Sequence, residues 1–326
     1  MDGVNTETAP VAAVTALSDR LRAGLIGHES LVERLMVALI ARGHVLIEGP
    51  PGLAKTRAVK RLADGLDGSF ARIQCTPDLM PSDLTGTQVF RRDSETFDFV
   101  AGPVFHSLVL VDEINRAPPK VQSALLEAMA EGQVTVGGVT RPLPDPFMVV
   151  ATQNSIEHEG TFPLPEAQLD RFLLHVALDL PGAGAERAIL DLVEAEDRGP
   201  APALAGDLRL GPPAVIAARH AAAEVHLAPA LKDFIVRLVI GTRETGGGPL
   251  DGLVEHAVSP RGTLALAAAT RARALLHGRD HGLPEDVEAL AADALAHRLI
   301  PSWRATSEGI DSRAIIARLL AHVRPW

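Results

Sequence analysis

HVLIEGPPGLAKTRAVKRLA, residues 44–63, joins a short apolar run, a turn rich in glycine and proline, and the start of a helix. The run His44–Glu48 predicts a buried strand, and Thr56–Leu66 predicts the helix after it. Packing alone gives no reason for the turn Gly49–Thr56 between them. A phosphate does, because small residues let backbone N–H groups converge on phosphate oxygens at a helix N-terminus. The stretch therefore predicts a phosphate-binding loop within an α/β fold.

The parts of this loop would have different tasks. Its backbone would cradle the phosphates of a nucleotide, Lys55 would reach the β- and γ-phosphates, and Thr56 would hold Mg²⁺. The predicted cradle consists of Gly49, Pro50, Pro51, Gly52, Leu53, Ala54, Lys55 and Thr56. Ala54 stands where the usual pattern has glycine, and alanine disfavours positive φ angles, so the loop is a variant. An ordinary strand–turn–helix connection is the alternative interpretation.

Polar side chains at the ends of two later strands support the first interpretation. Asp112 and Glu113 follow the apolar run LVLV, and Asn154 ends FMVVATQN. Ligands bind at the carboxyl ends of the strands in an open parallel sheet. Asp112 is therefore predicted to hold Mg²⁺ through water, and Glu113 to orient and polarise the attacking water. Asn154 would bond the γ-phosphate or that water; each of these residues alone could simply end a strand.

The remaining pattern predicts a mostly parallel sheet with helices on both faces, because strands alternate with helices. Helices are expected at Val11–Arg22, Glu29–Arg42 and 118–132, and further strands at Ala71–Cys75, 106–113, 147–154 and 171–178. Two hairpins, 87–100 and 133–143, interrupt the alternation and are expected to turn at 93–96 and at Gly137–Gly138. They are interpreted as insertions.

A change in pattern after Pro181–Gly182 predicts two domains. Residues 1–182 would form the α/β nucleotide-binding domain, with a loose tail at 1–10. From residue 183 to residue 326 the apolar residues have helical spacing and no strand is expected, so this part is predicted to be all-α.

Composition excludes several classes of protein. The net charge of -10, from 31 basic and 41 acidic residues, disfavours a protein that depends on non-specific contacts with nucleic acid. Apolar runs are too short to span a membrane, and the first residues lack the features of a signal peptide. Cys75 is the single cysteine, so an internal disulfide framework is excluded. A cytoplasmic protein is expected, with no predicted metal other than Mg²⁺.

Several longer stretches resemble the MoxR family of AAA+ ATPases. They are GPPGLAKT, TPDLMPSDLTG, AGPVF, LVDEINRAPPKVQSALLEAMAEGQVTV, ATQN and EGTFPLPEAQLDRFLL within residues 24–182, and SPRG further on. The resemblance implies a P-loop AAA+ core followed by a helical lid, and ATP hydrolysis coupled to conformational change. The two hairpins are similar to the helix-2 insert and the pre-sensor-1 insert, which usually point toward the pore or a face of a ring.

The resemblance also implies roles for individual residues. Gly49–Thr56 resembles Walker A, Asp112–Glu113 resembles Walker B, and Asn154 resembles sensor 1. Ile26 and Gly27 match the backbone segment that borders adenine.

Two arginines acquire roles only from the resemblance. Arg171, in LDRF, is similar to the arginine finger that reaches the γ-phosphate of a neighbouring subunit. Arg261, in SPRG, resembles sensor 2 on a lid helix that faces the nucleotide. The alternatives are a structural Arg171 paired with Glu166 or Asp170, and a surface role for Arg261 at a helix start.

The family implies partners as well. A ring, most often a homo-hexamer, is expected, together with a client or adaptor protein that is remodelled or activated. The adaptor could carry a von Willebrand factor A domain, and metal-cofactor insertion is one possible task. Two alternatives stay open: a nucleic-acid-remodelling motor or loader, and a nucleotide switch that does not hydrolyse ATP. A GTPase is disfavoured because the chain lacks an Asn-Lys-x-Asp motif.

Overall fold

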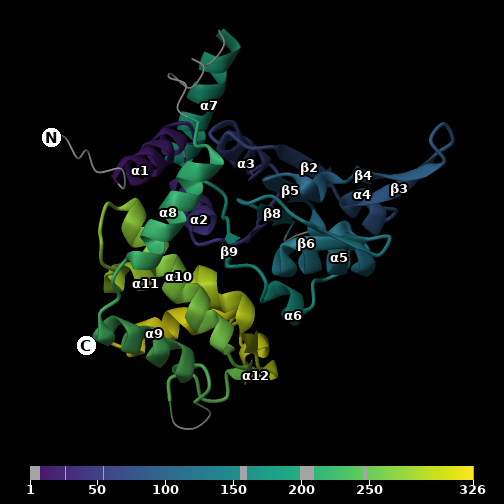
Figure 1. Cartoon of the computed structure of the whole chain (residues 1–326). Coiled ribbons are helices and arrows are strands. Elements are labelled where there is room, and N and C mark those ends of the chain that lie inside the picture. Colours follow the sequence, from purple (N-terminus) through teal and green to yellow (C-terminus); the bar gives the residue numbers. More distant parts are fainter. Residues whose placement is uncertain are drawn as a thin grey trace.

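A five-stranded sheet forms the centre of the molecule (Figure 1). The computed structural model describes residues 8–25, 27–53, 55–154, 160–198, 209–244 and 248–325. The strands are β2 (Phe70–Gln74), β5 (Leu108–Asp112), β8 (Met148–Gln153), β1 (Val45–Glu48) and β9 (Leu174–Ala177), in that spatial order. All neighbouring pairs are parallel, which confirms the predicted fold class.

Both faces of the sheet are covered, because successive residues of a strand point to opposite faces. Val45 and Ile47 pack with α1 (Thr8–Ala23), α2 (Glu29–Ile40) and α3 (Lys55–Asp64). Leu46 points the other way and joins the cluster formed with α4 (Pro81–Thr85) and α5 (Pro119–Glu131). A strand buried on both faces needs a continuous apolar run, and VLI in β1 is such a run.

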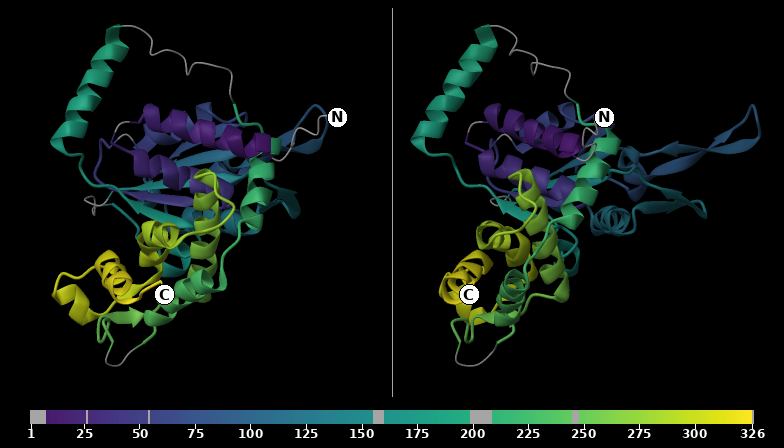
Figure 2. Two further views of the ribbon diagram at one scale, coloured as in Figure 1. Left: turned by 90° about the vertical axis from the view of Figure 1, so that its left-hand side faces the viewer. Right: turned by 60° about the vertical axis from the view of Figure 1, so that its left-hand side comes forward.

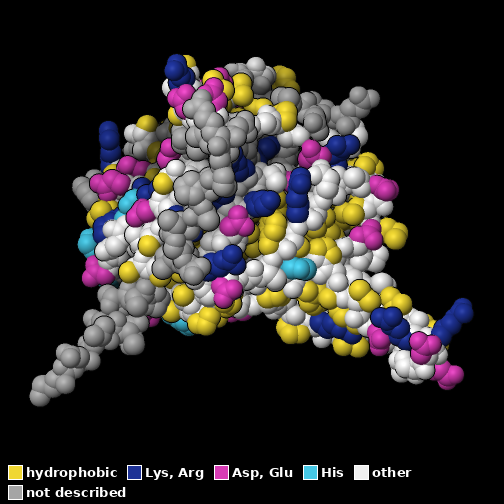
Figure 3. All heavy atoms as spheres, turned by 90° about the horizontal axis from the view of Figure 1, so that it is seen from above, with side chains coloured by type: hydrophobic (Ala, Val, Ile, Leu, Met, Phe, Trp, Pro, Cys, Tyr) yellow, Lys and Arg dark blue, Asp and Glu magenta, His cyan; other side chains and the backbone are white. Residues whose placement is uncertain are grey.

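Both predicted hairpins are present. β3 (Gly86–Arg91) pairs with β4 (Thr96–Ala101), and β6 (Gln133–Val136) pairs with β7 (Val139–Pro142). Figure 2 shows that they extend from the same side of the sheet, and the guanidinium of Arg141 lies 3.9 Å from the ring centroid of Phe99, which links them. Seen from above, the end of the β3–β4 hairpin is a projection that carries side chains of both charges (Figure 3).

The part of the chain after residue 182 is mainly helical. It contains α7 (Ala183–Arg198), α8 (Pro212–Glu224), α9 (Pro229–Gly241), α10 (Pro260–Leu276), α11 (Pro284–Leu295), α12 (Trp303–Ser307) and α13 (Ser312–His322). The expectation that it holds no strand is wrong, since β10 (Val254–His256) pairs with β11 (Ile300–Pro301). Segments of two or three residues are too short to show an alternating pattern. None of the described helices is both long and apolar enough to cross a bilayer.

Other boundaries also differ from the predictions. Residues 1–7 of the predicted loose tail lie outside the described residues, but Thr8–Pro10 already belong to α1, so the tail prediction is wrong there. β9 begins at Leu174, three residues later than expected. Phe172 is buried in the turn after α6 (Glu166–Leu169), not in β9. An apolar residue buried in a turn gives the same sequence pattern as one buried in a strand, so the strand was predicted to begin too early. The short 3-10 helices are η1 (Pro103–Phe105), η2 (Ile114–Arg116) and η3 (Ala296–Arg298).

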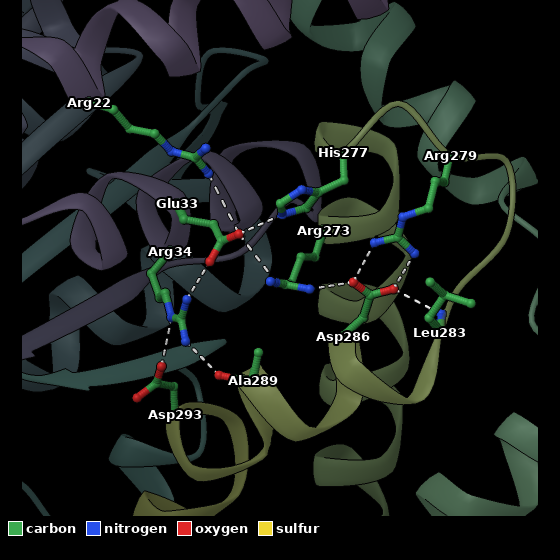
Figure 4. A network of polar contacts seen from close by, with 10 residues as sticks. All are labelled: Arg22, Glu33, Arg34, Arg273, His277, Arg279, Leu283, Asp286, Ala289 and Asp293. Carbon is green, nitrogen blue, oxygen red and sulfur yellow. Dashed lines mark hydrogen bonds and ion pairs between the residues drawn. The ribbon is translucent and has the colours of Figure 1, made fainter.

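A network of ion pairs joins α2 to the C-terminal helices (Figure 4). Glu33 of α2 is buried. Its Oε1 lies 3.2 Å from Nε of Arg273 in the last turn of α10 and 2.8 Å from Nε2 of His277, the residue after that helix. Burial by itself raises the pKa of Glu33. The hydrogen bond from His277 and the charges of Arg273 and Arg34 outweigh burial and hold the pKa below its ordinary value. Glu33 therefore stays ionised where an unpaired carboxylate would be costly.

The network continues into α11. Arg34 contacts Asp293 at 2.9 Å, while Asp286, which is fully buried, accepts two hydrogen bonds of 2.7 Å from Arg279 and a further one from Arg273. One apolar core also runs from the sheet face through α2 into α10 and α11. The helical part therefore packs as a continuation of the sheet region, and the domain boundary near residue 182 stays a prediction about chain organisation.

A buried histidine fixes the start of β1. His44 accepts a hydrogen bond from the backbone N–H of Val149 at Nδ1, 3.0 Å, and its Nε2 lies 3.2 Å from the carbonyl oxygen of Met129. This pair of contacts requires the neutral tautomer with the proton on Nε2. Burial lowers the pKa of His44 to about 4; the bond to Met129 opposes this, and the charge of Arg219 adds to it.

The shifted pKa of His44 predicts acid sensitivity. Below pH 6.5 the unfolded chain binds a proton at His44 that the folded chain does not bind until about pH 4. Stability is therefore lost as the pH falls through this window, by about 2 kcal/mol between pH 7 and pH 5. Urea unfolding at both pH values should show a smaller loss in His44→Gln, which keeps a donor and an acceptor but does not titrate. Equal losses in both proteins would contradict this account.

Candidate active site

Two residues of the loop between β1 and α3 occupy positions that favour glycine. At Gly49 a Cβ atom would lie 2.7 Å from the carbonyl oxygen of Leu178, so any side chain would clash with the end of β9. Gly52 has φ +86°, a left-handed conformation that favours glycine, and the space around it is open. The two glycines therefore have different reasons: close packing at Gly49 and conformation at Gly52. Ala54 lies outside the described residues.

Lys55 begins α3 with its side chain directed under the loop. It is 8% exposed, and its ammonium donates to the carbonyl oxygen of Gly49 at 2.7 Å and to Oδ1 of Asn154 at 3.1 Å. A third bond of 3.1 Å goes to the carbonyl oxygen of Gln153 at the end of β8. The ammonium thus lies between the carboxyl ends of β1 and β8, where the predicted phosphates would be.

Asp112 lies at the end of β5 and shares its carboxylate among three neighbours. The hydroxyl of Thr56 is 3.4 Å from both carboxylate oxygens, and the hydroxyl of Thr152 donates to Oδ1 at 3.1 Å. Nε of Arg72 lies 2.7 Å from Oδ2. A hydroxyl and a carboxylate that face each other are the hard oxygen ligands that Mg²⁺ prefers. Thr56 and Asp112 therefore fit the predicted metal position.

Glu113 has a constrained backbone and a carboxylate held on one side. Its φ of 57° and ψ of 52° are unusual for a residue other than glycine, and its N–H donates to the hydroxyl of Thr152 at 3.0 Å. Gln74 and Arg116 both donate to Oε2, at 3.0 and 3.1 Å. Within the described residues Oε1 has no hydrogen bond, so it can accept one from water. Arg116 therefore helps to hold the carboxylate of Glu113 from one side.

These groups surround one cavity of about 600 Å³ at the carboxyl edge of the sheet. Its lining consists of Pro51, Gly52, Leu53, Lys55, Thr56, Arg57, Lys60, Arg72, Gln74, Asp112, Glu113, Thr152 and Asn154. The volume is within the range of small-ligand sites. The cavity thus combines loop backbone, an ammonium, a hydroxyl and two carboxylates. This set of groups fits a nucleoside triphosphate with its cation. Gly49 and Pro50 belong to the loop but do not line the cavity.

Sequence reasoning missed Arg72 and Gln74, although a signal for them existed. Both lie on β2 and contact the two carboxylates of the site. In ARIQC they stand two residues apart, so they share a face of the strand. Arg72 and Gln74 alternate with the apolar residues Ile73 and Cys75. One face of this strand is therefore polar, and a polar face on a strand of the central sheet indicates a site.

The predicted adenine border is only partly described. Ile26 lies outside the described residues. Gly27 has φ +77°, its N–H donates to Oε1 of Glu29 at 3.1 Å, and a Cβ atom there would lie 3.1 Å from the Cβ of Ala185 in α7. Gly27 does not line the cavity, so its role toward adenine stays a prediction.

Arg171 lies at the opposite edge of the sheet from the cavity. Because β9 is parallel to β1 and starts opposite Val45, the residues just before β9 are at the amino edge, whereas the loop follows the carboxyl end of β1. Arg171 is exposed, and Nη1 donates to the carbonyl oxygen of Leu126 at 2.6 Å. Among the described residues it forms no ion pair with Glu166 or Asp170, which was the structural alternative.

Arg261 lies on the surface that also carries Asp170 and Arg171. It follows the first residue of α10, is 66% exposed, and lies 3.5 Å from Asp170, the residue before Arg171. Asp170 is held in turn by Arg298 at 2.7 Å. Arg261 does not line the nucleotide cavity of its own chain, so its role toward a nucleotide stays a prediction. Packing of α10 against the amino edge brings Arg261 and Arg171 to one surface, which chain order does not reveal.

Two family models match parts of this chain. A family model described as "ATPase family associated with various cellular activities (AAA)" matches residues 44–174, and a model described as "AAA lid domain" matches residues 251–319. The first match contains the loop, both carboxylates and Arg171, and the second contains Arg261.

Individual proteins match over most of the chain. Chaperone MoxR1 of Mycobacterium tuberculosis is 44% identical over 302 residues, which are 92% of this chain and 78% of that protein. Protein MoxR of Methylorubrum extorquens is 35% identical over 295 residues, 84% of each chain. The crystal structure of a candidate ATPase from Cytophaga hutchinsonii superposes with a TM-score of 0.88 at 37% identity and covers 98% of this chain and 96% of its own.

Proposed function

The chain belongs to the MoxR family of AAA+ ATPases, and we propose that it binds ATP with Mg²⁺ in the cavity at the carboxyl edge of the sheet and hydrolyses it. One observation carries the proposal: Lys55, the adjacent pair Asp112 and Glu113, and Asn154 come from three separate segments and meet around one cavity. A protein that only bound a nucleotide would have no use for a carboxylate placed like that of Glu113.

The residues of the chain divide the work of binding. Loop N–H groups and the N-terminus of α3 would hold the phosphates, while the ammonium of Lys55 would neutralise their charge. Thr56 and Asp112 would hold Mg²⁺, which supplies positive charge at the phosphate oxygens when it is bound. Arg72 now occupies one oxygen of Asp112, so we expect this contact to change on binding.

Glu113 and Asn154 would carry the chemical step. Oε1 of Glu113 would accept a hydrogen bond from the attacking water and take its proton as the water bonds to the γ-phosphorus and ADP leaves with the bridging oxygen. Gln74 and Arg116 hold Oε2, so they would keep the carboxylate oriented. Asn154 contacts Lys55 and would bond the γ-phosphate or the water through its amide.

A complete site requires a second subunit. Arg171 and Arg261 lie together at the edge away from their own cavity. If a neighbouring copy presents this surface to the cavity, both guanidiniums can reach the γ-phosphate there. We therefore propose that Arg171 is an arginine finger, that Arg261 also acts on a neighbour's nucleotide, and that the subunits form a ring, most often six in this family. The two hairpins would then lie on the pore or a face of that ring.

The proposed task is chaperone-like remodelling of a partner protein in the cytoplasm. Its support is the family and the name of the Mycobacterium tuberculosis relative, Chaperone MoxR1. An adaptor with a von Willebrand factor A domain, and a task in metal-cofactor insertion, rest on the family resemblance alone. We also propose that residues 1–182 form the nucleotide-binding domain and residues 183–326 the lid.

Lys55→Ala tests the site directly. Charge-assisted contacts are worth roughly 1.5–3 kcal/mol, so the variant should bind ATP about 10- to 150-fold more weakly in calorimetric titrations with Mg²⁺. Lys232→Ala, which removes an exposed lysine of α9, is the matched control and should bind ATP normally. A folded Lys55→Ala protein with unchanged affinity would remove the assignment of the phosphate loop, and with it the proposed function.

A further inference from the structure

A second cavity lies where α2, α8 and α10 meet, remote from the phosphate loop in the sequence and in the sheet. Its volume is about 440 Å³. The lining consists of Ile40, Ala41, Arg42, Arg219, His220, Ala222, Ala223, Ala268 and Arg271. Ala41 and Arg42 follow the C-terminus of α2 and precede β1, so the cavity is near the amino edge of the sheet (Figure 1). None of its residues lines the nucleotide cavity.

A buried arginine forms the base of this cavity. Arg219 is 6% exposed; its Nε donates to the carbonyl oxygen of Leu39 at 3.0 Å, and its Nη1 lies 2.6 Å from Oδ1 of Asp145. These contacts hold the guanidinium in place and satisfy a carbonyl at the end of α2. Nη2, the other terminal nitrogen, has no hydrogen-bond partner among the described residues. Because Arg219 lines the cavity, we expect the donors of this nitrogen to be available to a ligand there.

Arg42 adds a second positive charge to the cavity, and its backbone conformation is unfavourable for an arginine. It has φ 56° in the turn that ends α2, where the N–H of Gly43 bonds the carbonyl oxygen of Ala38 at 2.8 Å. This C-terminal position favours glycine strongly, so an arginine there costs stability. In the described part of the chain Arg42 has no hydrogen bond or ion pair from its side chain. A residue that is unfavourable for the fold and has no structural partner indicates a use for the side chain itself.

The cavity has little negative charge to balance its arginines. Arg271 provides a third guanidinium, whose Nε donates to the carbonyl oxygen of Val225 at 3.2 Å. No aspartate or glutamate is among the lining residues, and Asp145, which pairs with Arg219, is 59% exposed at its side chain. Burial lowers the pKa of Arg219, Asp145 opposes this, and the nearby charge of Arg42 lowers it further. In a chain with a net charge of -10, three arginines that line one cavity without a carboxylate favour an anionic ligand there.

We propose that this cavity binds a small phosphate-bearing molecule as a second ligand, separate from the nucleotide at the loop. Guanidinium forks match the geometry of phosphate oxygens and bind them with paired, charge-assisted hydrogen bonds. A volume of about 440 Å³ suits a small metabolite rather than a protein segment. Alanine side chains and Ile40 form the remaining wall, which can contact an apolar portion of the ligand.

The ligand would contact two helices and the turn that follows a third. Arg42 lies in the turn after α2, Arg219 is in α8, and Arg271 is in α10. Because α10 also carries Arg261 at its first turn, occupation of the cavity would hold α10 on the sheet region near the surface that presents Arg261. Binding is the claim under test, and it does not depend on ATP hydrolysis.

Inorganic pyrophosphate is the probe, titrated into the full chain by calorimetry. The natural chain should bind it at two sites, one at the loop and one at the arginine cavity. Lys55→Ala should weaken pyrophosphate binding at the loop by at least about tenfold, and Arg42→Gly should weaken it at the arginine cavity by at least about tenfold. The double variant Lys55→Ala with Arg42→Gly should lose both. Arg318→Ala, an exposed arginine of α13, is the matched control and should keep two sites.

Arg42→Gly separates a binding role from a structural one. Glycine suits the left-handed conformation, so the unfolding midpoint should stay the same or rise while the second pyrophosphate site is lost. Equal numbers of sites in Arg42→Gly and the natural chain would overturn the proposal. Citrate tests the ligand class in the Lys55→Ala background: weaker binding than pyrophosphate is expected, and tighter binding would overturn the assignment to phosphate. Failure here leaves the loop site untouched, so the two proposals are tested separately.

Discussion

Arg171→Ala should bind ATP with nearly normal affinity and hydrolyse it about 10³- to 10⁵-fold more slowly, the range that arginine fingers contribute. The side chain lies at the amino edge of the sheet, away from the cavity of its own chain, so its loss should leave the binding groups in place. In an assembled ring, however, every γ-phosphate would lose a guanidinium that stabilises developing charge. Steady-state phosphate release and calorimetric ATP binding measure the two halves of this prediction.

A mixing experiment distinguishes action on a neighbour from action within one chain. Arg171→Ala retains Lys55, and Lys55→Ala retains Arg171, so a ring assembled from both contains some interfaces with an intact pair. Activity should partly return on mixing if subunits exchange and sites fire independently. Full activity of Arg171→Ala as an isolated subunit would refute the finger assignment and remove the main reason to expect a ring.

Controls are needed because Arg171 also bonds the carbonyl oxygen of Leu126. Thermal unfolding and sizing in ATP must show that Arg171→Ala folds and assembles like the natural chain. Arg318→Ala removes an exposed arginine that lies far along the chain and should have normal activity. Arg171→Lys keeps the charge without the fork, so an intermediate rate would support direct contact with the phosphate.

Glu113→Gln should retain ATP binding and lose about 10²- to 10⁴-fold in the rate of hydrolysis, the usual contribution of a general base. The amide has nearly the shape of the carboxylate but cannot accept a proton from water. Gln74 and Arg116 can still bond one oxygen of the new side chain, so the geometry of the site should persist. We also expect the ATP-bound assembly to be more stable in the variant, because the nucleotide remains intact.

A single-turnover measurement separates chemistry from product release in this variant. Glu131→Gln, an exposed residue at the end of α5, is the matched control and should hydrolyse ATP normally. If Glu113→Gln keeps the natural rate, Glu113 does not activate the water, and a different group must do so. Retained binding would leave the assignment of Lys55 and Asp112 intact even then.

Much of this fold could be predicted because its signals are local. A continuous apolar run in β1, glycines at the loop, and a helix beginning at Lys55 are consecutive in the chain, and each predicts its own conformation. The hairpin at Gly137–Gly138 is equally local, since both glycines have positive φ angles. Asp112, Glu113 and Asn154 were predictable for a related reason: parallel strands end at one edge of a sheet, so residues at those ends must come together.

The contacts between distant segments could not be predicted in this way. Chain order gave no indication that α10 places Arg261 beside Asp170, so the surface that Arg261 occupies could not be predicted. The orientation of the Glu113 carboxylate by Gln74 likewise depends on two strands that are far apart in the sequence. Periodicity reports which residues are buried, but not which buried surfaces meet.

The amino-acid sequence by itself determined the α/β core, the phosphate loop and the residues at the strand ends, because these depend on neighbours in the chain and on the direction of parallel strands. Tertiary structure alone decided which edge the two arginines occupy and that Arg42, Arg219 and Arg271 converge on one cavity. Those three residues come from α8, α10 and the turn after α2, and the mutual packing of these helices is set by side-chain shape over the whole core. Shape complementarity of that kind is a property of the folded molecule and has no short pattern in the chain.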